Sequence, residues 1–439
     1  MKKNLIQIFL LVLSSAYCFS QEVDKDQLDN YLNDLETYNK FMGSIAVSRD
    51  GEWIYTKSVG YCDAENKTKA SEKSKYRVGS ISKTFTAVLI LKAVEENKIE
   101  LNEPLSNYFP TIENATTITI DQLLYHRSGI HSVTDDEDYL EWNTQPKSEQ
   151  ELIDKMVKGG SEFEPDSKFE YSNSNYILLS FILQNVYDKT YAELLDEKIT
   201  APLGLKDTYY GSKINPSENE CYSYSFSSKW EKESETDMSV PMGAGAVVST
   251  ASDLNKFAQA LFLGKIISNE SVEQMIGLKD NFGRGVFPIP FEDNEGFGHT
   301  GAIDGFASMF VYFPETNVCL TMLSNGTNYN NNEISRAVLS VVYNVSYDFP
   351  EFKTYDVTEK ELKKYLGTYV TSDLPLKLTI FNEGNILIAQ ATGQQALHLE
   401  AIDKDTFTFD RAGVVIIFDP EKNVLLLKQG GGEFNFVKE

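Results

Sequence analysis

Three short groups of residues in this chain could together carry out acyl transfer on a serine hydroxyl. They are Ser80-Ile81-Ser82-Lys83, Tyr171-Ser172-Asn173 and His299-Thr300-Gly301, in this order. A serine attacks a carbonyl carbon when a nearby base accepts its proton, and a lysine amine can act as that base. A phenol can relay a proton to the leaving group. These residue types supply a nucleophile, a base and a proton relay, with no need for a metal or a catalytic histidine dyad.

The spacing of Ser80 and Lys83 favours direct contact between their side chains. On a helix, residues three positions apart lie on one face, and Gly79 permits a tight turn into the first helical turn. The positive end of the helix dipole would favour an alkoxide-like Ser80 oxygen and, for a partly buried Lys83, the neutral amine. A lysine base needs a pKa of about 7 to 8 and contributes about 10² to 10⁴ in rate. The plain alternative is a serine helix cap followed by a solvated lysine.

Each of the other two groups can also be interpreted either as part of a catalytic site or as a simple structural element. The Asn173 amide could hold both Lys83 and a substrate carbonyl, although Ser and Asn also favour simple helix caps. The small Ala302 after Gly301 would let a backbone N–H point at a developing oxyanion, whereas the alternative is a polar turn between strands. Because all three groups occur together and in order, the catalytic interpretation is favoured.

The three groups resemble the S-x-x-K, Y-x-N and K/H-T-G motifs of the serine β-lactamase and penicillin-recognising superfamily. The branch concerned contains class C β-lactamases, DD-peptidases and related esterases. The resemblance covers about residues 30 to 345. It implies a β-lactamase/transpeptidase-like domain, with an antiparallel sheet flanked by helices and a helical subdomain. Further stretches that resemble this branch are Tyr76 to Ser80, Leu123 to Gly129, Ala201 to Thr208 and Gly243 to Phe257.

The resemblance also implies roles. Ser80 is implied to be the nucleophile, Lys83 its base partner and Tyr171 the proton relay. No counterpart of the acidic residue that class A β-lactamases use for deacylation is assignable. Residues implied to bind substrate are Asn173, His299, Thr300, Gly301 and Ala302, the last through a backbone amide that forms an oxyanion hole with that of Ser80.

One departure from the pattern concerns substrate charge. Class C β-lactamases usually carry Lys in the third motif, whereas His299 is mostly neutral at pH 7 if unperturbed. That lowers the positive potential available to bind a substrate carboxylate and to keep Tyr171 acidic. Arg284 is a candidate replacement as a carboxylate clamp, with an exposed surface arginine as the alternative. His126 is expected to be structural, as a side-chain cap for a loop.

The surrounding sequence predicts the elements that must position these residues. Residues 44–48 and 53–55 read as strands around a turn, residues 82–97 as a buried helix, and strand signals return at 310–313 and 318–323. Strands at both ends of a helical insertion predict one α+β domain whose sheet is completed by its C-terminal part. After roughly residue 350, short β-rich runs predict a small antiparallel barrel or sandwich.

The N-terminus has the order of a secretory signal peptide. Lys2 and Lys3 precede the apolar run Leu5 to Leu13 and then small and polar residues. The predicted division is residues 1–20 signal peptide, 21–350 hydrolase domain and 351–439 C-terminal β domain. The expected location is periplasmic or secreted. A lipid anchor at Cys18 is the less favoured alternative, because Tyr17 is bulky for such a site.

Composition excludes several classes of partner. A formal net charge of -25 repels nucleic acid and anionic membrane surfaces, and no stable membrane insertion is expected once the signal is removed. Cys62, Cys221 and Cys319 are an odd number without a C-x-x-C pair, which argues against a disulfide framework but leaves one bridge open. The histidines show no metal-ligand spacing, so no metal or cofactor is expected. The expected partner is a small-molecule or peptide substrate, and the oligomeric state is left open.

Three functional hypotheses follow. The leading one is an exported serine hydrolase that forms an acyl-enzyme on Ser80 and acts on a D-amino-acid peptide, amide or ester, as a DD-peptidase or esterase would. The first alternative is a true class C-like β-lactamase. The second is a non-catalytic binding or regulatory protein in which the β domain recognises a partner, although the complete motifs argue against it.

Overall fold

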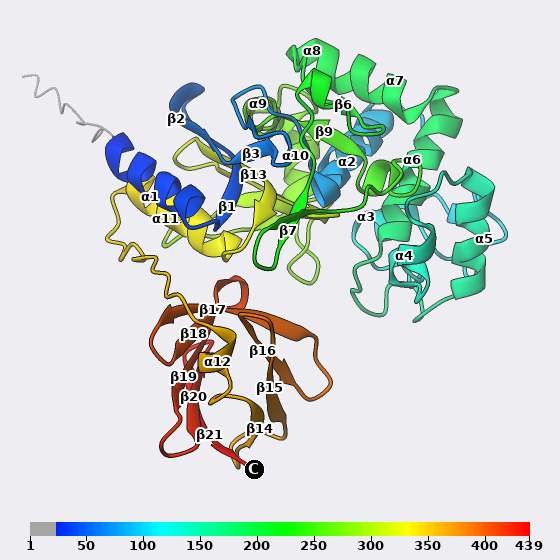
Figure 1. The fold of residues 1–439 in the computed structure, drawn as a ribbon. Helices are drawn as coiled ribbons and strands as arrows, with labels where there is room; N and C mark the ends of the chain where they lie inside the picture. Colours follow the sequence, from blue (N-terminus) through cyan, green and yellow to red (C-terminus); the bar gives the residue numbers. More distant parts are fainter. Residues whose placement is uncertain (1–22) are drawn as a thin grey trace, which may run out of the picture.

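The computed structural model describes residues 23–439, so the predicted signal peptide of residues 1–20, with Cys18, lies outside the described part. In that part an α+β region is followed by a closed barrel of strands, as Figure 1 shows. This confirms the predicted fold class. Among residues 23–439, no helix combines the length and the apolar character that crossing a membrane requires.

The α+β region is built on an eight-stranded sheet. Its main order is β10-β11-β12-β13-β1-β2, with β7 beside β13 and β8 beside β7. Because β1 pairs with β13, strands from the two ends of the region meet inside the sheet, as the sequence predicted. The bounds are β1 Phe41–Arg49, β2 Glu52–Val59, β7 Tyr224–Phe226, β8 Trp230–Lys232, β10 Phe287–Pro288, β11 Phe297–Ile303, β12 Phe306–Phe313 and β13 Val318–Thr327.

Strand β13 runs further than the sequence indicated. The sequence predicted a strand over residues 318–323, but the strand continues through Ser324-Asn325-Gly326, and Gly326 lies opposite Met42 of β1. The polar side chains are buried because neighbouring backbone uses them: Ser324 Oγ donates to the Met42 carbonyl at 3.0 Å, and Asn325 Nδ2 donates to the Tyr61 carbonyl at 2.9 Å. Residues typical of a turn therefore sit inside a sheet.

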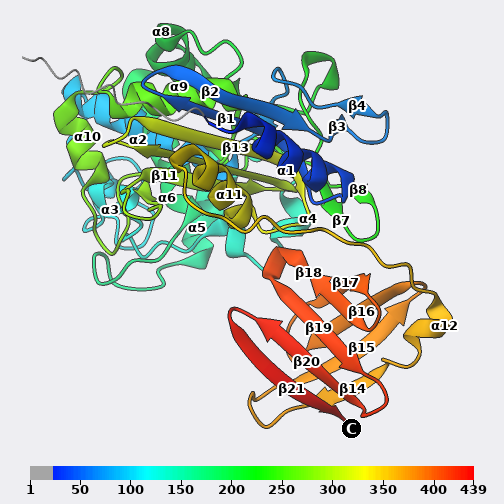
Figure 2. The same ribbon diagram turned by 90° about the vertical axis from the view of Figure 1, so that its left-hand side faces the viewer.

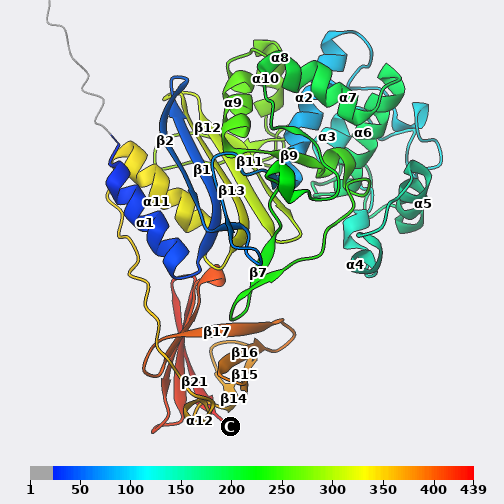
Figure 3. The same cartoon turned by 45° about the horizontal axis from the view of Figure 1, so that its top comes forward.

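Helices cover both faces of this sheet. Helices α1 (Lys25–Thr37) and α11 (Asn331–Tyr343) pack on one face, and α9 (Ala251–Phe262) packs on the other, as Figure 3 shows. Helix α1 begins at its cap Asp24 and buries an apolar stripe of Leu28, Tyr31, Leu32 and Leu35 at helical spacing. Since both faces are covered, β1 and β13 are buried along almost their whole length.

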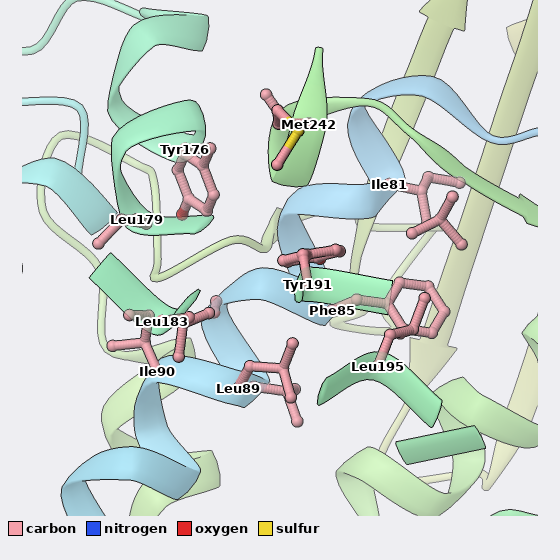
Figure 4. Close-up of a cluster of buried hydrophobic side chains, with 14 of the residues drawn as sticks. Ile81, Phe85, Leu89, Ile90, Tyr176, Leu179, Leu183, Tyr191, Leu195 and Met242 are labelled. Atoms are coloured by element: carbon pink, nitrogen blue, oxygen red, sulfur yellow. The ribbon is translucent and has the colours of Figure 1, made fainter. Parts of the chain in front are cut away.

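The predicted buried helix is α2 (Ser82–Glu95), which lies at the centre of the helical part beside α6 (Asn173–Tyr187). Figure 4 shows the apolar side chains packed around it. The Phe85 ring of α2 stacks on Phe257 of α9 with centroids 3.8 Å apart. The other helices here are α3 Ile120–Leu124, α4 Tyr139–Trp142, α5 Glu149–Gly159, α7 Tyr191–Leu195, α8 Ala201–Leu203 and α10 Asn269–Ile276.

Short elements connect the helical part to the sheet. The 3₁₀ turns η1 (Gly79–Ile81), η3 (Val133–Asp135) and η6 (Met242–Ala244) lie around α2 and α6. One small sheet pairs β3 (Tyr61–Asp63) with β4 (Thr68–Lys69). Another has the order β5-β9-β6, with β5 Tyr76–Arg77, β9 Val247–Ser249 and β6 Tyr209–Tyr210.

The cysteines form a single bridge within the described residues. Cys62 of β3 is bonded to Cys221, which lies 159 residues away, and Cys319 is free and buried in β13. The backbone supports this pairing, because Tyr222 N–H donates to the Cys62 carbonyl at 3.0 Å. The single bridge that the odd cysteine count left open is therefore present.

The C-terminal part is a closed barrel of β14 to β21 in sequence order, shown in Figure 2 with the short helix α12 (Glu359–Leu362) beside it. The barrel core is filled by side chains, including Tyr369, Phe407, Phe418 and Phe436. The choice between barrel and sandwich is thereby decided in favour of a barrel. Its strands are β14 Gly367–Val370, β15 Lys377–Glu383, β16 Ile386–Ala391, β17 Ala396–Asp403, β18 Thr406–Phe409, β19 Val414–Asp419, β20 Val424–Gln429 and β21 Gly432–Lys438.

A buried lysine links the barrel to the larger region. Lys40, just before β1, forms ion pairs with Glu400 at 2.9 Å and Asp410 at 2.8 Å, and its side chain is 4% exposed. Asn328 also donates to Glu400. Burial alone would lower the pKa of Lys40, but Asp410 and Glu400 raise it overall. The division at residue 350 stays a prediction, and it falls in a stretch between α11 and α12 that has neither helix nor strand.

Candidate active site

Ser80 sits in the η1 turn, which packs closely against strand β11. Gly79 has a φ of +51°, and a Cβ there would lie 2.8 Å from the Ala302 amide nitrogen. A Cβ on Gly301 would lie 2.1 Å from the Val78 carbonyl oxygen and 3.0 Å from the Ser80 amide nitrogen. Two positions without side chains therefore let the turn that carries Ser80 pack directly on the strand that carries Ala302, and an oxyanion hole formed by their two amides requires this closeness.

Lys83 is fully buried one helical turn after Ser80, so the solvated alternative does not apply. Its Nζ lies 3.0 Å from Ser80 Oγ, 2.7 Å from Asn173 Oδ1 and 2.9 Å from the Ala244 carbonyl oxygen. Burial lowers the pKa of Lys83 well below 10.5, and no charged partner in the described part of the chain offsets that effect. A neutral amine matches these contacts, with two N–H groups for Asn173 and Ala244 and a lone pair for the Ser80 hydroxyl proton.

The Ala244 carbonyl is held in place by hydrogen bonds between η6 and α2. Thr86 Oγ1 donates to the Gly243 carbonyl at 2.7 Å, and Val247 N–H donates to Ser82 Oγ at 2.9 Å. A Cβ on Gly243 would lie 2.6 Å from Thr86 Oγ1, so this loop also needs its glycine. Ser82, the second serine of the first motif, thus helps to hold the loop whose Ala244 carbonyl accepts a hydrogen bond from Lys83.

Asn173 begins helix α6 with its amide orientation fixed. Its Nδ2 donates to Thr134 Oγ1 at 2.8 Å, and its backbone N–H donates to Ser132 Oγ at 3.2 Å. Since Oδ1 faces Lys83, the amide can orient the lysine while Thr134 holds its Nδ2. Thr134 of η3 and Ser132, the residue before η3, orient Asn173. No sequence motif singled out either residue.

Tyr171 completes the group around Ser80. The Lys83 Nζ lies 4.9 Å from the centroid of the Tyr171 ring. Burial raises the pKa of Tyr171, and a hydrogen bond with Ser80 opposes that rise without cancelling it. The side chain is therefore a phenol, which can donate a proton, beside a lysine that can accept one.

His126 supports Tyr171 from behind. The two rings are stacked with centroids 4.2 Å apart, and His126 Nδ1 accepts the Ser172 N–H at 3.1 Å. Burial lowers the pKa of His126 well below 6.5, so the ring is neutral with its proton on Nε2. His126 has the loop-capping position expected from the sequence.

His299 lies in β11 and is buried against the rings of Phe282 and Phe287. Burial lowers the pKa of His299 to about 3. Its Nδ1 contacts the Thr300 carbonyl, and its Nε2 is buried without a hydrogen-bond partner. The third motif therefore brings no positive charge to the site.

Arg284 does not lie where a carboxylate clamp would be needed. Its Nε donates to Asp121 Oδ1 at 2.8 Å, its guanidinium lies 4.5 Å from the centroid of the Tyr125 ring, and it also donates to the Gln274 carbonyl. The side chain is 12% exposed, so it is also not the exposed arginine of the alternative. Arg284 forms an ion pair with Asp121 of α3. The expectation that it clamps a substrate carboxylate is therefore wrong.

Two cavities meet at Ser80 and Ala302. The Asn173 cavity, of about 380 Å³, and the Tyr171 cavity, of about 570 Å³, share only these two residues. Lining the Asn173 cavity are also Thr134, Tyr139, Leu140, Asn143, Glu233, Ser234, Thr236, Pro241, Ala244, Gly245, Ile303 and Asp304. Lining the Tyr171 cavity are also Phe282, Phe287, His299, Thr300, Gly301, Ala307, Ser308, Met309, Met322, Asn331 and Asn332.

The structure thus brings together most of the residues that the sequence singled out. Ser80, Lys83, Tyr171 and Asn173 converge, with the His299-Thr300-Gly301 strand along one wall, and only Arg284 lies apart. Sequence reasoning missed the Ala244 carbonyl, Thr134 and the cavity walls, because their partners are close only in space. Among residues 23–439, no cluster of His, Cys, Asp and Glu is placed to hold a metal ion.

Comparison with known proteins agrees with this geometry. The family model described as Beta-lactamase matches residues 33–343. A penicillin-binding protein of Bacillus subtilis (strain 168) is 25% identical over 450 residues, covering 93% of this chain and 98% of that protein. The D-amino acid amidase from Ochrobactrum anthropi SV3, complexed with D-phenylalanine, superposes with a TM-score of 0.64 at 27% identity, covering 73% of this chain and 100% of that one.

A further likeness extends over the barrel. The octameric penicillin-binding protein homologue from Pyrococcus abyssi matches with a TM-score of 0.66 at 23% identity, covering 95% of this chain and 100% of that chain. At this identity the likeness shows the fold alone. It indicates that an α+β region followed by the C-terminal part recurs in at least one solved structure.

Proposed function

Since the chain belongs to the beta-lactamase family and is a serine hydrolase that acts by acyl transfer, we propose that Ser80 is its nucleophile and that its substrate is a D-amino-acid peptide, amide or ester. The observation that carries the assignment is the set of contacts of the buried Lys83 amine. Two neutral acceptors hold its N–H groups, and the third contact is the Ser80 hydroxyl.

In the first step, Ser80 Oγ attacks the carbonyl carbon of the substrate while its proton passes to the Lys83 lone pair. A carbon–oxygen bond forms, and the carbonyl electron pair moves onto the oxygen. The N–H groups of Ser80 and Ala302 stabilise that oxyanion, and each such donor is typically worth about 10² to 10³ in rate. The lowered pKa of Lys83 favours the neutral amine that this step requires.

In the second step, the oxyanion collapses and the bond to the leaving group breaks. The proton held by Lys83 reaches the leaving nitrogen or oxygen through the Tyr171 phenol, which leaves an acyl ester on Ser80. Water then attacks this ester, with its proton taken by the same lysine and phenol, and releases the acid and the free serine. The stacked His126 keeps the phenol next to Ser80 throughout.

The D-amino-acid assignment is supported by the relatives. They are named as a penicillin-binding protein and a D-amino acid amidase, and they cover 93% and 73% of this chain. A β-lactamase remains the second candidate within the family, but the uncharged His299 gives it less support. We also propose that the protein is exported, on the basis of the N-terminal segment of residues 1–20.

Labelling followed by intact-mass measurement tests the nucleophile. The wild-type protein should gain one acyl group from a p-nitrophenyl ester or from benzylpenicillin, and Ser80→Ala should gain none. Ser372→Ala, which removes an exposed hydroxyl on the barrel, controls for the handling of a serine variant. Equal labelling of wild type and Ser80→Ala would show that the nucleophile lies elsewhere.

A further inference from the structure

The position of Tyr171 identifies the cavity that receives the leaving group. A group that protonates the leaving atom must face that atom. Tyr171 lines only the Tyr171 cavity, whereas Asn173 lines only the other one. This inference rests on the proposed function: the leaving group lies in the Tyr171 cavity, and the acyl group lies in the Asn173 cavity.

No charged side chain lines the Tyr171 cavity. Its walls are aromatic and thioether groups, among them Phe282, Phe287, Met309 and Met322, together with neutral hydroxyl and amide side chains. Met309 and Met322 are directly paired across β12 and β13. His299 is the one titratable group besides Tyr171, and its burial between two phenylalanine rings keeps it neutral.

Two arginines that are close in the chain to residues lining the cavity each lie beside a carboxylate. Arg284 is paired with Asp121, and Arg336 of α11 lies 3.9 Å from Glu292. Lys83 is occupied by its three contacts and is not part of the cavity wall. No lysine or arginine among residues 23–439 is therefore part of the cavity wall.

The N-terminus of α11 does not replace these cations. Asn331 and Asn332 at its start line the cavity, but the Asn332 N–H already donates to Asn330 Oδ1 at 2.9 Å. The Glu333 N–H donates to the Asn330 carbonyl at 3.0 Å, and the Glu333 carboxylate lies in the first turn. These amides are satisfied within the helix, and an acid offsets the helix dipole there.

We propose that the Tyr171 cavity selects leaving groups without charge, so that the enzyme cleaves amides and esters that release ammonia, an apolar amine or an alcohol. A peptide that ends in a free carboxylate at this position is discriminated against. A carboxylate in the cavity would lose hydration and gain no counter-ion. The bond that breaks is the acyl–nitrogen or acyl–oxygen bond, water supplies the new acyl oxygen, and the leaving group departs with a proton.

The rest of the cleft adds to this selection. The charged residues lining the Asn173 cavity are both acids, Glu233 and Asp304. Asp304 is paired with Arg77 at 2.9 Å, whereas the Glu233 carboxylate forms no ion pair within the described residues. With a formal net charge of -25 over the whole chain, the field at the cleft opposes an anionic substrate.

Two matched esters test the proposal. These are the 3-carbamoylphenyl and 3-carboxyphenyl esters of N-acetyl-D-alanine, which share the acyl group and differ in one charge on an activated leaving group. After correction for their hydroxide-catalysed rates, the carbamoyl ester should have a kcat/KM about ten to a hundred times higher. Equal values, or a preference for the carboxylate, would overturn the proposal while leaving the acyl-transfer function intact.

A variant that adds a cation sharpens the test. Asn332 is exposed at the edge of the Tyr171 cavity. Asn332→Arg should raise kcat/KM for the carboxyphenyl ester by about tenfold relative to the carbamoyl ester, and the uncharged Asn332→Gln should leave this ratio near that of wild type. An Arg variant that changes both esters equally would contradict the proposal. If neither ester is turned over and Ser80 is not acylated, the proposed function itself fails, and this inference fails with it.

Discussion

Two lysines in this protein are almost completely buried, one at the cleft and one at the contact with the barrel, and their surroundings differ. Lys40 meets two carboxylates, Glu400 and Asp410, which raise its pKa against the effect of burial. Lys83 meets a hydroxyl, an amide oxygen and a backbone carbonyl, so burial lowers its pKa unopposed. The same side chain is thus a paired cation in one place and, on the proposed function, a base in the other.

The comparison shows that the partners of a buried lysine, and not its burial, decide what it can do. Carboxylates compensate the charge and make Lys40 an anchor between two parts of the chain. Neutral acceptors orient the Lys83 amine without stabilising its charged form, so the lone pair stays available to Ser80. Each prediction below tests either the site around Lys83 or the ion pairs of Lys40.

The largest effect is expected from Lys83→Arg. An arginine stays protonated in a protein, so it places a cation where the account has a neutral amine, and Ser80 loses its base. The ester kcat/KM should fall by about 10² to 10⁴. Lys40→Arg is the matched control, because a guanidinium can still pair with Glu400 and Asp410. A Lys83→Arg enzyme with more than a tenth of wild-type activity would show that Lys83 is not the base.

Gly79→Ala should be nearly as damaging to activity. The new methyl group would press on the Ala302 backbone and separate the two amides that face the oxyanion, at a cost of about 10² to 10³ in kcat. Gly204→Ala is the control, since Gly204 also has a positive φ, of 65°, but nothing lies within 4 Å of the added Cβ. Stopped-flow acylation rates of both variants would separate strain from loss of the oxyanion site.

Lys40→Met should act on stability and spare catalysis. Glu400 and Asp410 would lose their shared cation, at a cost of about 1 to 3 kcal/mol, which is below that of a fully buried pair because they keep 27% and 19% exposure. Urea unfolding monitored by tryptophan fluorescence would measure this change. Lys422→Met, which breaks an exposed pair with Asp419, should leave the midpoint unchanged. A Lys40→Met protein with lost activity and unchanged stability would contradict the anchor role.

The pH dependence is expected to be the smallest of these effects. The folded-state pKa of Lys83 lies well below its unfolded value of 10.5, so between the two the unfolded chain binds more protons and stability rises with pH. Over its own titration, kcat/KM should rise about tenfold per pH unit as the neutral amine forms. The Lys40 contribution has the opposite sign: it is complete below 10.5 and is lost as pH rises through its raised folded-state pKa. A flat ester profile below pH 9 would count against Lys83.

The sequence predicted those parts of the site that are local in the chain. Ser80 and Lys83 share a helical turn, so their contact follows from spacing alone. The Ala244 carbonyl and the Asp121 partner of Arg284 come from distant loops, and no local pattern indicates which atoms meet. The resemblance to the family motifs, and not the spacing of the residues, predicted that Tyr171 lies beside Ser80 and Lys83.

The fold shows the same division. Short apolar runs after residue 350 predicted a barrel or sandwich, whereas β17 and β21 give no such signal because most of their side chains are only partly buried or exposed. The Cys62–Cys221 bridge joins residues 159 positions apart, so an odd cysteine count could leave it open but not assign it. Pairings that depend on tertiary contacts therefore lay beyond the sequence.

The central claim, that Lys83 is a neutral base, is tested most directly by the pKa of its amine. An NMR titration of ¹³C-labelled lysine side chains, assigned with Lys83→Arg and Lys40→Arg, would follow both buried amines in one sample. The Lys83 signal should titrate well below 10.5 and the Lys40 signal above it. A Lys83 signal that titrates at or above 10.5 would contradict the account.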